Sequence, residues 1–245
     1  MLRTSNPALK ETTFRGLPRA MEGQAMTLQG TVNKTGISLL ILLAAAAFVW
    51  QSAVVQPFIL IGLIGGLVTA VVTIFKNTAA PFTTPLYAAF EGLLLGGISK
   101  MFEMQYPGIV INAVALTFGT LAALLAAYST GIIRPSENFK LGIFAATGGI
   151  ALLYMATIVL GFFGVRVPYI HDSSPIGIAF SAFVVVIAAL NLVLDFDFIE
   201  RGAEAGAPKY MEWLGAFGLL VTLVWLYLEI LHLLAKLQGG GRDRR

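Results

Sequence analysis

Long apolar segments follow one another through most of this chain and are separated only by short polar stretches. A helix needs about 20 mainly apolar residues to cross a bilayer, and seven segments approach that length. They are Ile37–Val55, Phe58–Phe75, Pro85–Phe102, Ile109–Tyr128, Leu141–Val165, Ile176–Ile199 and Trp213–Leu237. The third is the least apolar, so a re-entrant or interfacial segment is its alternative. The sequence predicts an all-α polytopic membrane protein with seven transmembrane helices.

Composition supports this class. Hydrophobic residues make up 57% of the chain and charged residues only 12%, whereas a soluble domain averages about 25% charged. Cysteine is absent and there are 2 histidines, which excludes disulfides and thiolate chemistry and disfavours a zinc or di-iron site. Basic residues beside apolar helices are topology signals, so we expect no nucleic-acid partner.

Three parts divide the chain. Residues 1–36 form a polar N-terminal tail, 37–237 the seven-helix domain and 238–245 a basic C-terminal tail. The tail has no early apolar core of the kind found in a cleaved signal peptide. Lysine and arginine are more frequent in the tail and in the loops on its side of the membrane, which places the N-terminus in the cytoplasm.

Glycines recur inside the apolar segments, with four-residue spacing at Gly62–Gly66 and Gly92–Gly96. Small residues allow helix backbones to approach closely in lipid. We expect these glycines to serve packing within one chain rather than dimerisation.

Acidic side chains inside apolar segments are costly and are the first functional candidates. Glu229 lies in WLYLEILHLL and Glu91 in YAAFEGLLLGG. Insertion of an acid at the middle of a helix costs roughly 2.5 to 3.5 kcal/mol, so both should face the bundle interior. For Glu91, a structural hydrogen bond and a transport role are equally open.

Two aspartates occur in NLVLDFDFIERG at the end of the sixth segment. Residues two apart point to different sides of a helix. Asp195 shares its face with Asn191 and is the site candidate, whereas Asp197 precedes Arg201 by four residues and is expected to pair with it at the membrane boundary.

Two further polar residues lie near the helix ends. Lys76 ends the second segment, where it either snorkels to head groups or pairs with Asp195. His232 lies three residues after Glu229, where it either tunes Glu229 or is an interfacial residue. No nucleophile, phosphate-binding or metalloprotease motif is present, so we do not expect an enzyme.

The segments DFDFIE and WLYLEILHLL resemble the acidic pair of the Bax inhibitor-1 / transmembrane BAX inhibitor motif family. TSNPALKETTF and YAAFEGLLLGGIS resemble a bacterial branch that includes YccA-like proteins. The resemblance implies a bacterial inner-membrane protein with its last helix at the centre of the bundle. It also implies that Asp195 and Glu229 share a proton and gate a pH-sensitive calcium leak, with Lys76 as the latch. The seventh segment departs from the family by carrying Glu instead of Asp.

Geometry tests this implication. Asp195 and Glu229 are level in an antiparallel hairpin only if the turn is centred near residue 212, yet composition places the turn nearer Gly206–Pro208. That centre separates the acids by about 12 Å along the helix. Either the sixth helix continues beyond Arg201, or the pair is staggered and Glu229 lies nearer Glu91.

Three functions remain open. The first is a passive, pH-sensitive cation leak, with Ca²⁺ favoured because hard cations prefer carboxylate oxygens. Asp195 and Glu229 would then be transient Ca²⁺ ligands, and no cofactor is expected. The second is a regulatory protein that binds a membrane protease or another membrane complex, and the third is a proton-coupled transporter with Glu91 and Glu229 as relay acids. The lipid bilayer and Ca²⁺ or protons are the other expected partners.

Overall fold

The computed structural model describes residues 25–164 and 172–239. Within these ranges the chain forms seven long α-helices and the short 3-10 helix η2, Asn77–Ala79, with no β-strand. The long helices are α1 Leu28–Gln51, α2 Gln56–Phe75, α3 Ala80–Gln105, α4 Ile109–Ser129, α5 Glu137–Phe162, α6 Pro175–Glu204 and α7 Met211–Gly239. This confirms the predicted all-α membrane architecture.

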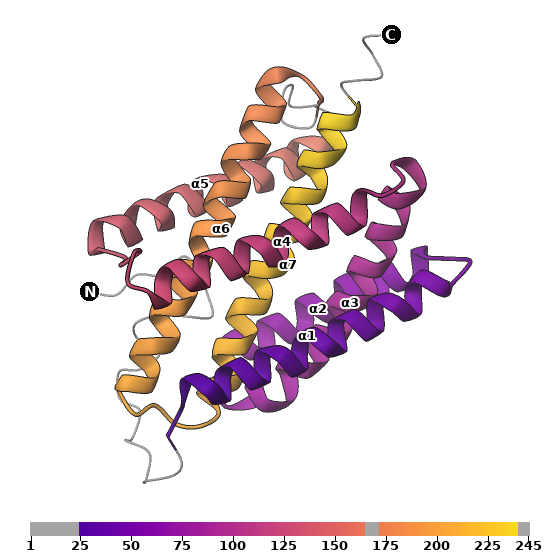
Figure 1. Cartoon of the computed structure of the whole chain (residues 1–245). Helices are drawn as coiled ribbons and strands as arrows, with labels where there is room; N and C mark the ends of the chain where they lie inside the picture. Colours follow the sequence, from indigo (N-terminus) through magenta and orange to yellow (C-terminus); the bar gives the residue numbers. More distant parts are fainter. Residues whose placement is uncertain (1–24, 165–171, 240–245) are drawn as a thin grey trace.

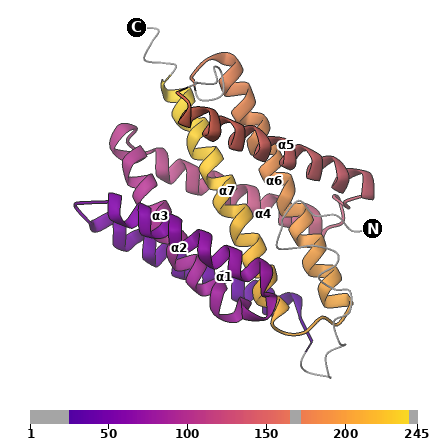
Figure 2. The same cartoon turned by 180° about the vertical axis from the view of Figure 1, so that it is seen from behind.

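Helix α7 lies at the centre of the bundle. Figures 1 and 2 show it running between α1–α3 on one side and α5–α6 on the other, with α4 crossing it. In its most apolar stretch 83% of the residues are buried, compared with 11% in α5. The last helix is therefore central, because in the other five candidate spans at most 44% of the corresponding stretch is buried.

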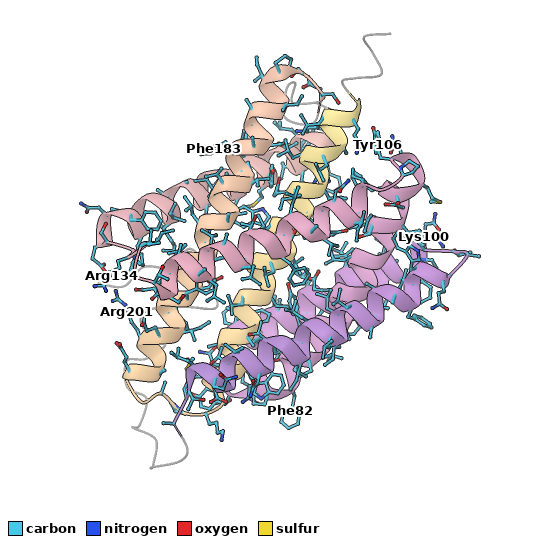
Figure 3. All side chains as sticks on the ribbon, in the orientation of Figure 1. Phe82, Lys100, Tyr106, Arg134, Phe183 and Arg201 are labelled. Atoms are coloured by element: carbon cyan, nitrogen blue, oxygen red, sulfur yellow. The ribbon has the colours of Figure 1, made fainter. Side chains whose placement is uncertain are left out.

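That outer surface suits lipid. Large apolar side chains such as Leu67, Phe82 and Leu152 are exposed on it, and an apolar surface this extensive does not occur on a soluble monomer. Figure 3 shows Phe82 and Phe183 pointing outward, Arg134 and Arg201 at one end of the bundle, and Lys100 and Tyr106 toward the opposite end. The charged ends and the apolar belt fit a membrane-spanning bundle.

Six of the described helices are long and apolar enough to cross a membrane, and α3 is the exception. Its 26 residues are long enough for a span, about 39 Å at 1.5 Å per residue. Helices α1, α2, α4 and α7 all contact α3, so its polar side chains face protein instead of lipid. Neighbouring helices therefore cover α3, the least apolar of the seven predicted segments.

The predicted role of the glycines in packing within one chain is confirmed for α2 and α3. A Cβ atom at Gly62 would lie 2.6 Å from the backbone of α3, and one at Gly92 would lie 2.3 Å from Leu42 O of α1. The glycines of α5 differ, because a Cβ at Gly142 or Gly149 would meet nothing within 4 Å. Close backbone approach thus joins α1, α2 and α3, and α5 lies loosely at the edge.

Several helix bounds differ from the apolar segments. Helix α1 begins at Leu28, inside the segment predicted to be a polar tail, and Thr31 and Thr35 are buried. Helix α2 begins at Gln56, two residues before the predicted apolar segment, and has Pro57 in its first turn. Residues 1–24 of the predicted N-terminal tail and 240–245 of the C-terminal tail lie outside the described residues.

Candidate functional site in the α6–α7 hairpin

The turn between α6 and α7 sets the register of the acidic residues. Gly206 ends α6 with a φ of 65°, a conformation that glycine adopts without strain. Across this turn, Thr222 Oγ1 donates a 2.6 Å hydrogen bond to Asp195 Oδ2. Residues 195 and 222 are thus level, so the turn is centred near Pro208, as the composition predicts.

Asp195 lies in a sealed environment. The residue is fully buried, and its partner Thr222 is 3% exposed. One turn earlier, Asn191 Nδ2 donates to Thr147 Oγ1 of α5 at 2.9 Å. The predicted polar stripe of Asn191 and Asp195 therefore faces other helices, with Asn191 bonded to α5 and Asp195 to α7.

Glu229 lies farther along α7 with different partners. Its Oε1 accepts hydrogen bonds from Tyr154 of α5 at 2.9 Å and from the indole of Trp225 at 3.2 Å. The residue is 5% exposed, but it lines a cavity of about 460 Å³. Two uncharged donors therefore hold a buried carboxyl group at the edge of an open space.

Polar side chains surround this cavity. The described residues that line it are Phe102, Gln105, Tyr106, Tyr154, Thr157, Ile158, Ser173, Ser181, Glu229, His232, Ala235 and Lys236. Lys236 Nζ donates to Ser181 Oγ at 2.7 Å, and the His232 ring packs edge-on against Phe102. His232 thus lines the same cavity as Glu229. We name this space the Glu229 cavity.

The structure does not join the two acids. Thr222, which marks the level of Asp195, lies seven residues before Glu229, or about 10 Å along the helix axis. The stagger expected for this turn is confirmed, but the neighbour of Glu229 is Tyr154 rather than Glu91. In the described part of the chain, no three His, Asp or Glu residues form a group that could hold a metal ion. A single ion held jointly by Asp195 and Glu229 does not fit this geometry.

Asp197 makes the predicted ion pair with Arg201, at 3.0 Å. The same Oδ2 also contacts Lys140 Nζ of α5 at 2.7 Å, and Lys140 is 2% exposed. In the sequence, Lys140 is only one of the basic residues that predict the topology. No local signal assigned it to Asp197, because the contact depends on how α5 docks on α6.

Lys76 is an exposed cap at the end of α2. Its helix packs on α3, whereas Asp195 is buried between α6 and α7. Among the described residues the structure shows no ion pair between them, and the latch stays a prediction.

Glu91 lies in another part of the bundle. It lines a pocket of about 250 Å³ formed by residues of α2, α3 and α7, none of which lines the Glu229 cavity. The predicted relay of Glu91 and Glu229 is therefore not a continuous path in this structure.

A second acid on α7 was not among the predicted site residues. Glu212 is fully buried in the first turn of α7, where it forms an ion pair with Lys34 of α1. Its Oε1 also accepts hydrogen bonds from the backbone N–H and the hydroxyl of Thr27, at 3.0 and 2.9 Å. The helix dipole favours an acid in the first turn of a helix. The position of Glu212 at the start of α7 was therefore the sequence signal that could have identified it. We call Thr27, Lys34 and Glu212 the N-terminal clamp.

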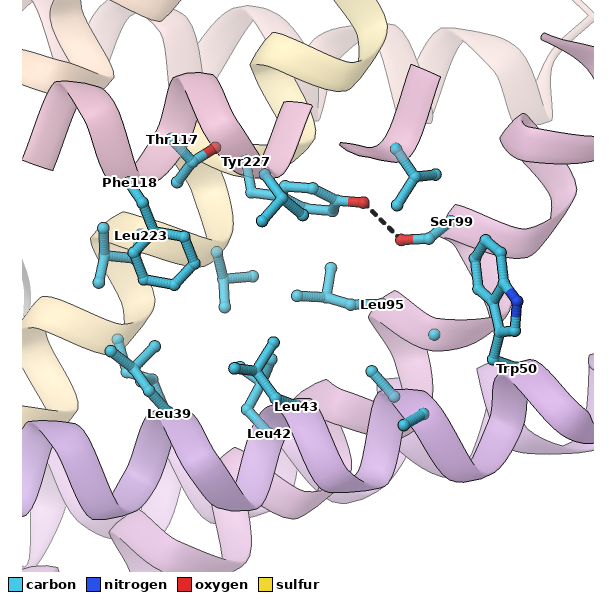
Figure 4. Close-up of a pocket in the computed structure, with 17 residues that line it drawn as sticks. Leu39, Leu42, Leu43, Trp50, Leu95, Ser99, Thr117, Phe118, Leu223 and Tyr227 are labelled. Atoms are coloured by element: carbon cyan, nitrogen blue, oxygen red, sulfur yellow. Dashed lines mark hydrogen bonds between the residues drawn. The ribbon is translucent and has the colours of Figure 1, made fainter. Parts of the chain in front are cut away.

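An apolar cavity of about 360 Å³ lies on the side of α7 opposite the Glu229 cavity. It is lined by residues of α1, α3, α4 and α7. Figure 4 shows its leucine-rich wall and the hydroxyls of Ser99 and Tyr227 directed toward each other, 2.6 Å apart. Of the residues that the structure describes, Tyr227 is the only ionisable one in its lining. It offers no carboxylate to a cation, so the Glu229 cavity is the better candidate site.

A family model described as Bax inhibitor 1 like matches residues 6–239. No curated protein and no solved structure matches the chain.

Proposed function

Since that match covers nearly the whole length, the chain belongs to the Bax inhibitor 1-like family of integral membrane proteins. We propose that it is a pH-sensitive passive cation leak, with Ca²⁺ as the first candidate ion. The observation that carries the proposal is the position of Glu229. It is a buried acid on the central helix and lines a polar cavity.

The two acids act in series in this proposal. A cation enters the Glu229 cavity, meets the carboxyl group of Glu229, and then passes along α7 toward Asp195. Conduction requires sites that bind an ion without holding it too tightly. Two separated carboxyl groups supply weaker sites than a cluster of three or more ligands would.

The path is closed in this structure. Trp225 donates to Glu229 from one turn nearer Thr222, and buried side chains such as Leu192 and Leu226 fill the neighbouring core. Opening therefore requires movement of α6 relative to α7. The loop that connects the two helices is short, so in this proposal the hydrogen bond between Thr222 and Asp195 is the contact that must break.

In this proposal, protonation of Glu229 and Asp195 controls whether the path opens. A protonated Glu229 or Asp195 keeps its hydrogen bonds as a neutral group. Loss of a proton leaves a negative charge among apolar helices, and such a charge requires a cation. Lys236 and His232 share the cavity with Glu229, so they compete with the permeant ion for that charge.

The test is Ca²⁺ flux into proteoliposomes at several pH values. We expect a pH-dependent flux that falls at least about tenfold in Asp195→Asn and in Glu229→Gln, because each change removes an acid that cannot be replaced by the other. Glu204→Gln is the matched control, since Glu204 is exposed at the end of α6. Wild-type flux in both site variants, or a flux that does not change with pH, contradicts the proposal.

A further inference from the structure

A separate pocket of about 250 Å³ opens on the lipid-facing surface between α2 and α7, over α3. Its lining is Leu63, Gly66, Leu67, Ala70, Ile74, Tyr87, Glu91, Phe217 and Val221. Leu63 and Leu67 are 53% and 65% exposed on the outer face of α2. A molecule dissolved in the bilayer therefore reaches this pocket without crossing the protein.

Among the described residues, Glu91 is the one charged residue of the lining. It is 9% exposed, and its Oε2 accepts no hydrogen bond from the described residues. The other polar residue is Tyr87, whose phenol hydrogen-bonds to the Glu91 carboxyl group and whose ring packs edge-on against Phe217. No described lysine, arginine or histidine lines the pocket, so the protein supplies the carboxyl group and one neutral donor and leaves the complementary charge to another molecule.

Gly66 keeps the space beside this carboxyl group free. A Cβ atom at Gly66 would lie 2.9 Å from Glu91 Oε1, which is closer than real Cβ contacts come. The glycine therefore lets the Glu91 side chain reach toward α2, at the edge from which a ligand would enter.

We propose that this pocket binds an amphiphilic amine from the bilayer, with its ammonium group on the Glu91 carboxylate and its alkyl chain along Leu63, Leu67 and Val221. A buried carboxylate is stable only when a charge or hydrogen-bond donor meets it, and charge-assisted hydrogen bonds are the strong ones. An uncharged lipid chain would fill the space but leave Oε2 without a donor.

The Glu229 cavity would not take the same ligand. Polar side chains such as Thr157, Ser181 and Lys236 line it, and they do not favour an alkyl chain. The two acids therefore differ in ligand class, with a small hydrated cation at Glu229 and an amine with an apolar tail at Glu91.

The test uses the full-length protein in proteoliposomes, with decylamine as the ligand and dicyclohexylcarbodiimide as the probe. The carboxyl O–H adds across one C=N bond of the carbodiimide to give an O-acylisourea. This intermediate either rearranges to a stable N-acylurea or reacts with a free amine, which displaces dicyclohexylurea and leaves an N-decyl amide. A carboxylate paired with an ammonium group lacks the proton for the first step, so a bound amine protects it. Mass spectrometry locates and counts both products. We expect total labelling at Glu91, as N-acylurea plus amide, that saturating decylamine lowers by about tenfold or more, and that decanol, an uncharged molecule with the same chain, leaves unchanged.

Two variants complete the test. Glu91→Gln should lose the adduct and bind decylamine about tenfold more weakly, whereas Glu204→Gln should bind it as the wild type does. Gly66→Ala should weaken binding too, with Gly142→Ala as its control because a Cβ there meets nothing within 4 Å. Absence of labelling at Glu91, equal protection by decanol, or full amine binding by Glu91→Gln overturns the proposal. None of these outcomes depends on ion flux.

Discussion

The two halves of α7 meet acidic residues in opposite ways. Along the N-terminal half, Glu212 of α7 and Asp195 of α6 are fully buried, with Lys34 and Thr27 as partners of Glu212 and Thr222 as the partner of Asp195. At the C-terminal end Glu229 lines an open polar cavity. One central helix thus has a sealed end, where protein groups satisfy the acids, and an open end, where water and ions can reach one.

This contrast teaches how a leak can remain closed. A path that was open at both ends would conduct continuously, whereas a path sealed at one end conducts only when the few contacts that seal it break. The N-terminal clamp fixes α7 to α1, and the Thr222–Asp195 bond fixes it to α6. The predictions below test whether the sealed end carries the stability of the bundle and the open end does not.

The largest effect is expected from Lys34→Met. The change leaves the fully buried Glu212 without its cation, and removing one partner of a buried ion pair costs about 3 to 5 kcal/mol in the free energy of unfolding. Lys236→Met is the matched change at the open end. It should cost about 1 kcal/mol or less, because Lys236 is partly exposed beside a polar cavity, where water can replace the hydrogen bonds that it donates to Gly177 O and Ser181 Oγ.

Unfolding in detergent micelles, followed by intrinsic fluorescence, measures both losses. A second substitution, Glu212→Gln, should restore part of the stability lost in Lys34→Met, because it removes the uncompensated charge. Equal losses in the two lysine variants would show that the ends do not differ.

The next effect concerns a single hydrogen bond at each end. Thr222→Val removes the donor at 2.6 Å from the buried Asp195, which should cost about 1 to 3 kcal/mol. Tyr154→Phe should cost about 1 kcal/mol or less, because Trp225 still donates to Glu229 and cavity water can replace the phenol. The same unfolding measurement compares them. A larger loss for Tyr154→Phe contradicts the distinction.

Sequence reasoning reached most of the fold because the bilayer fixes helix length. Ile109–Tyr128 and Phe58–Phe75 differ from α4 and α2 by only one or two residues. The start of α1 was less predictable, because the polar residues after Leu28 become helical where they pack on α7. That packing depends on Glu212, which is distant in sequence from Thr27 and Lys34.

The site was only partly predictable. Asp195, Glu229 and their stagger follow from the apolar pattern and the turn at Gly206. The partners do not, because helices that are apolar on every side give little sign of which face meets which neighbour. The contacts of Tyr154 with Glu229 and of Lys140 with Asp197 therefore could not be predicted, because they depend on how α5 docks on its neighbours.

The smallest effect is expected at the rim of the sealed end, where Arg201 pairs with Asp197. The Arg201 side chain is 37% exposed, and exposed ion pairs contribute about 0 to 1 kcal/mol. Asp197 also keeps Lys140 at 2.7 Å when Arg201 is removed. Arg201→Ala should therefore lower the free energy of unfolding by less than about 1 kcal/mol, and 1 M salt should abolish the difference, because the Debye length falls to about 3 Å. Lys140→Met removes a buried cation instead, so its loss should be larger and should persist in salt. If Arg201→Ala is the more damaging change, the rim and not the interior seals this end of α7.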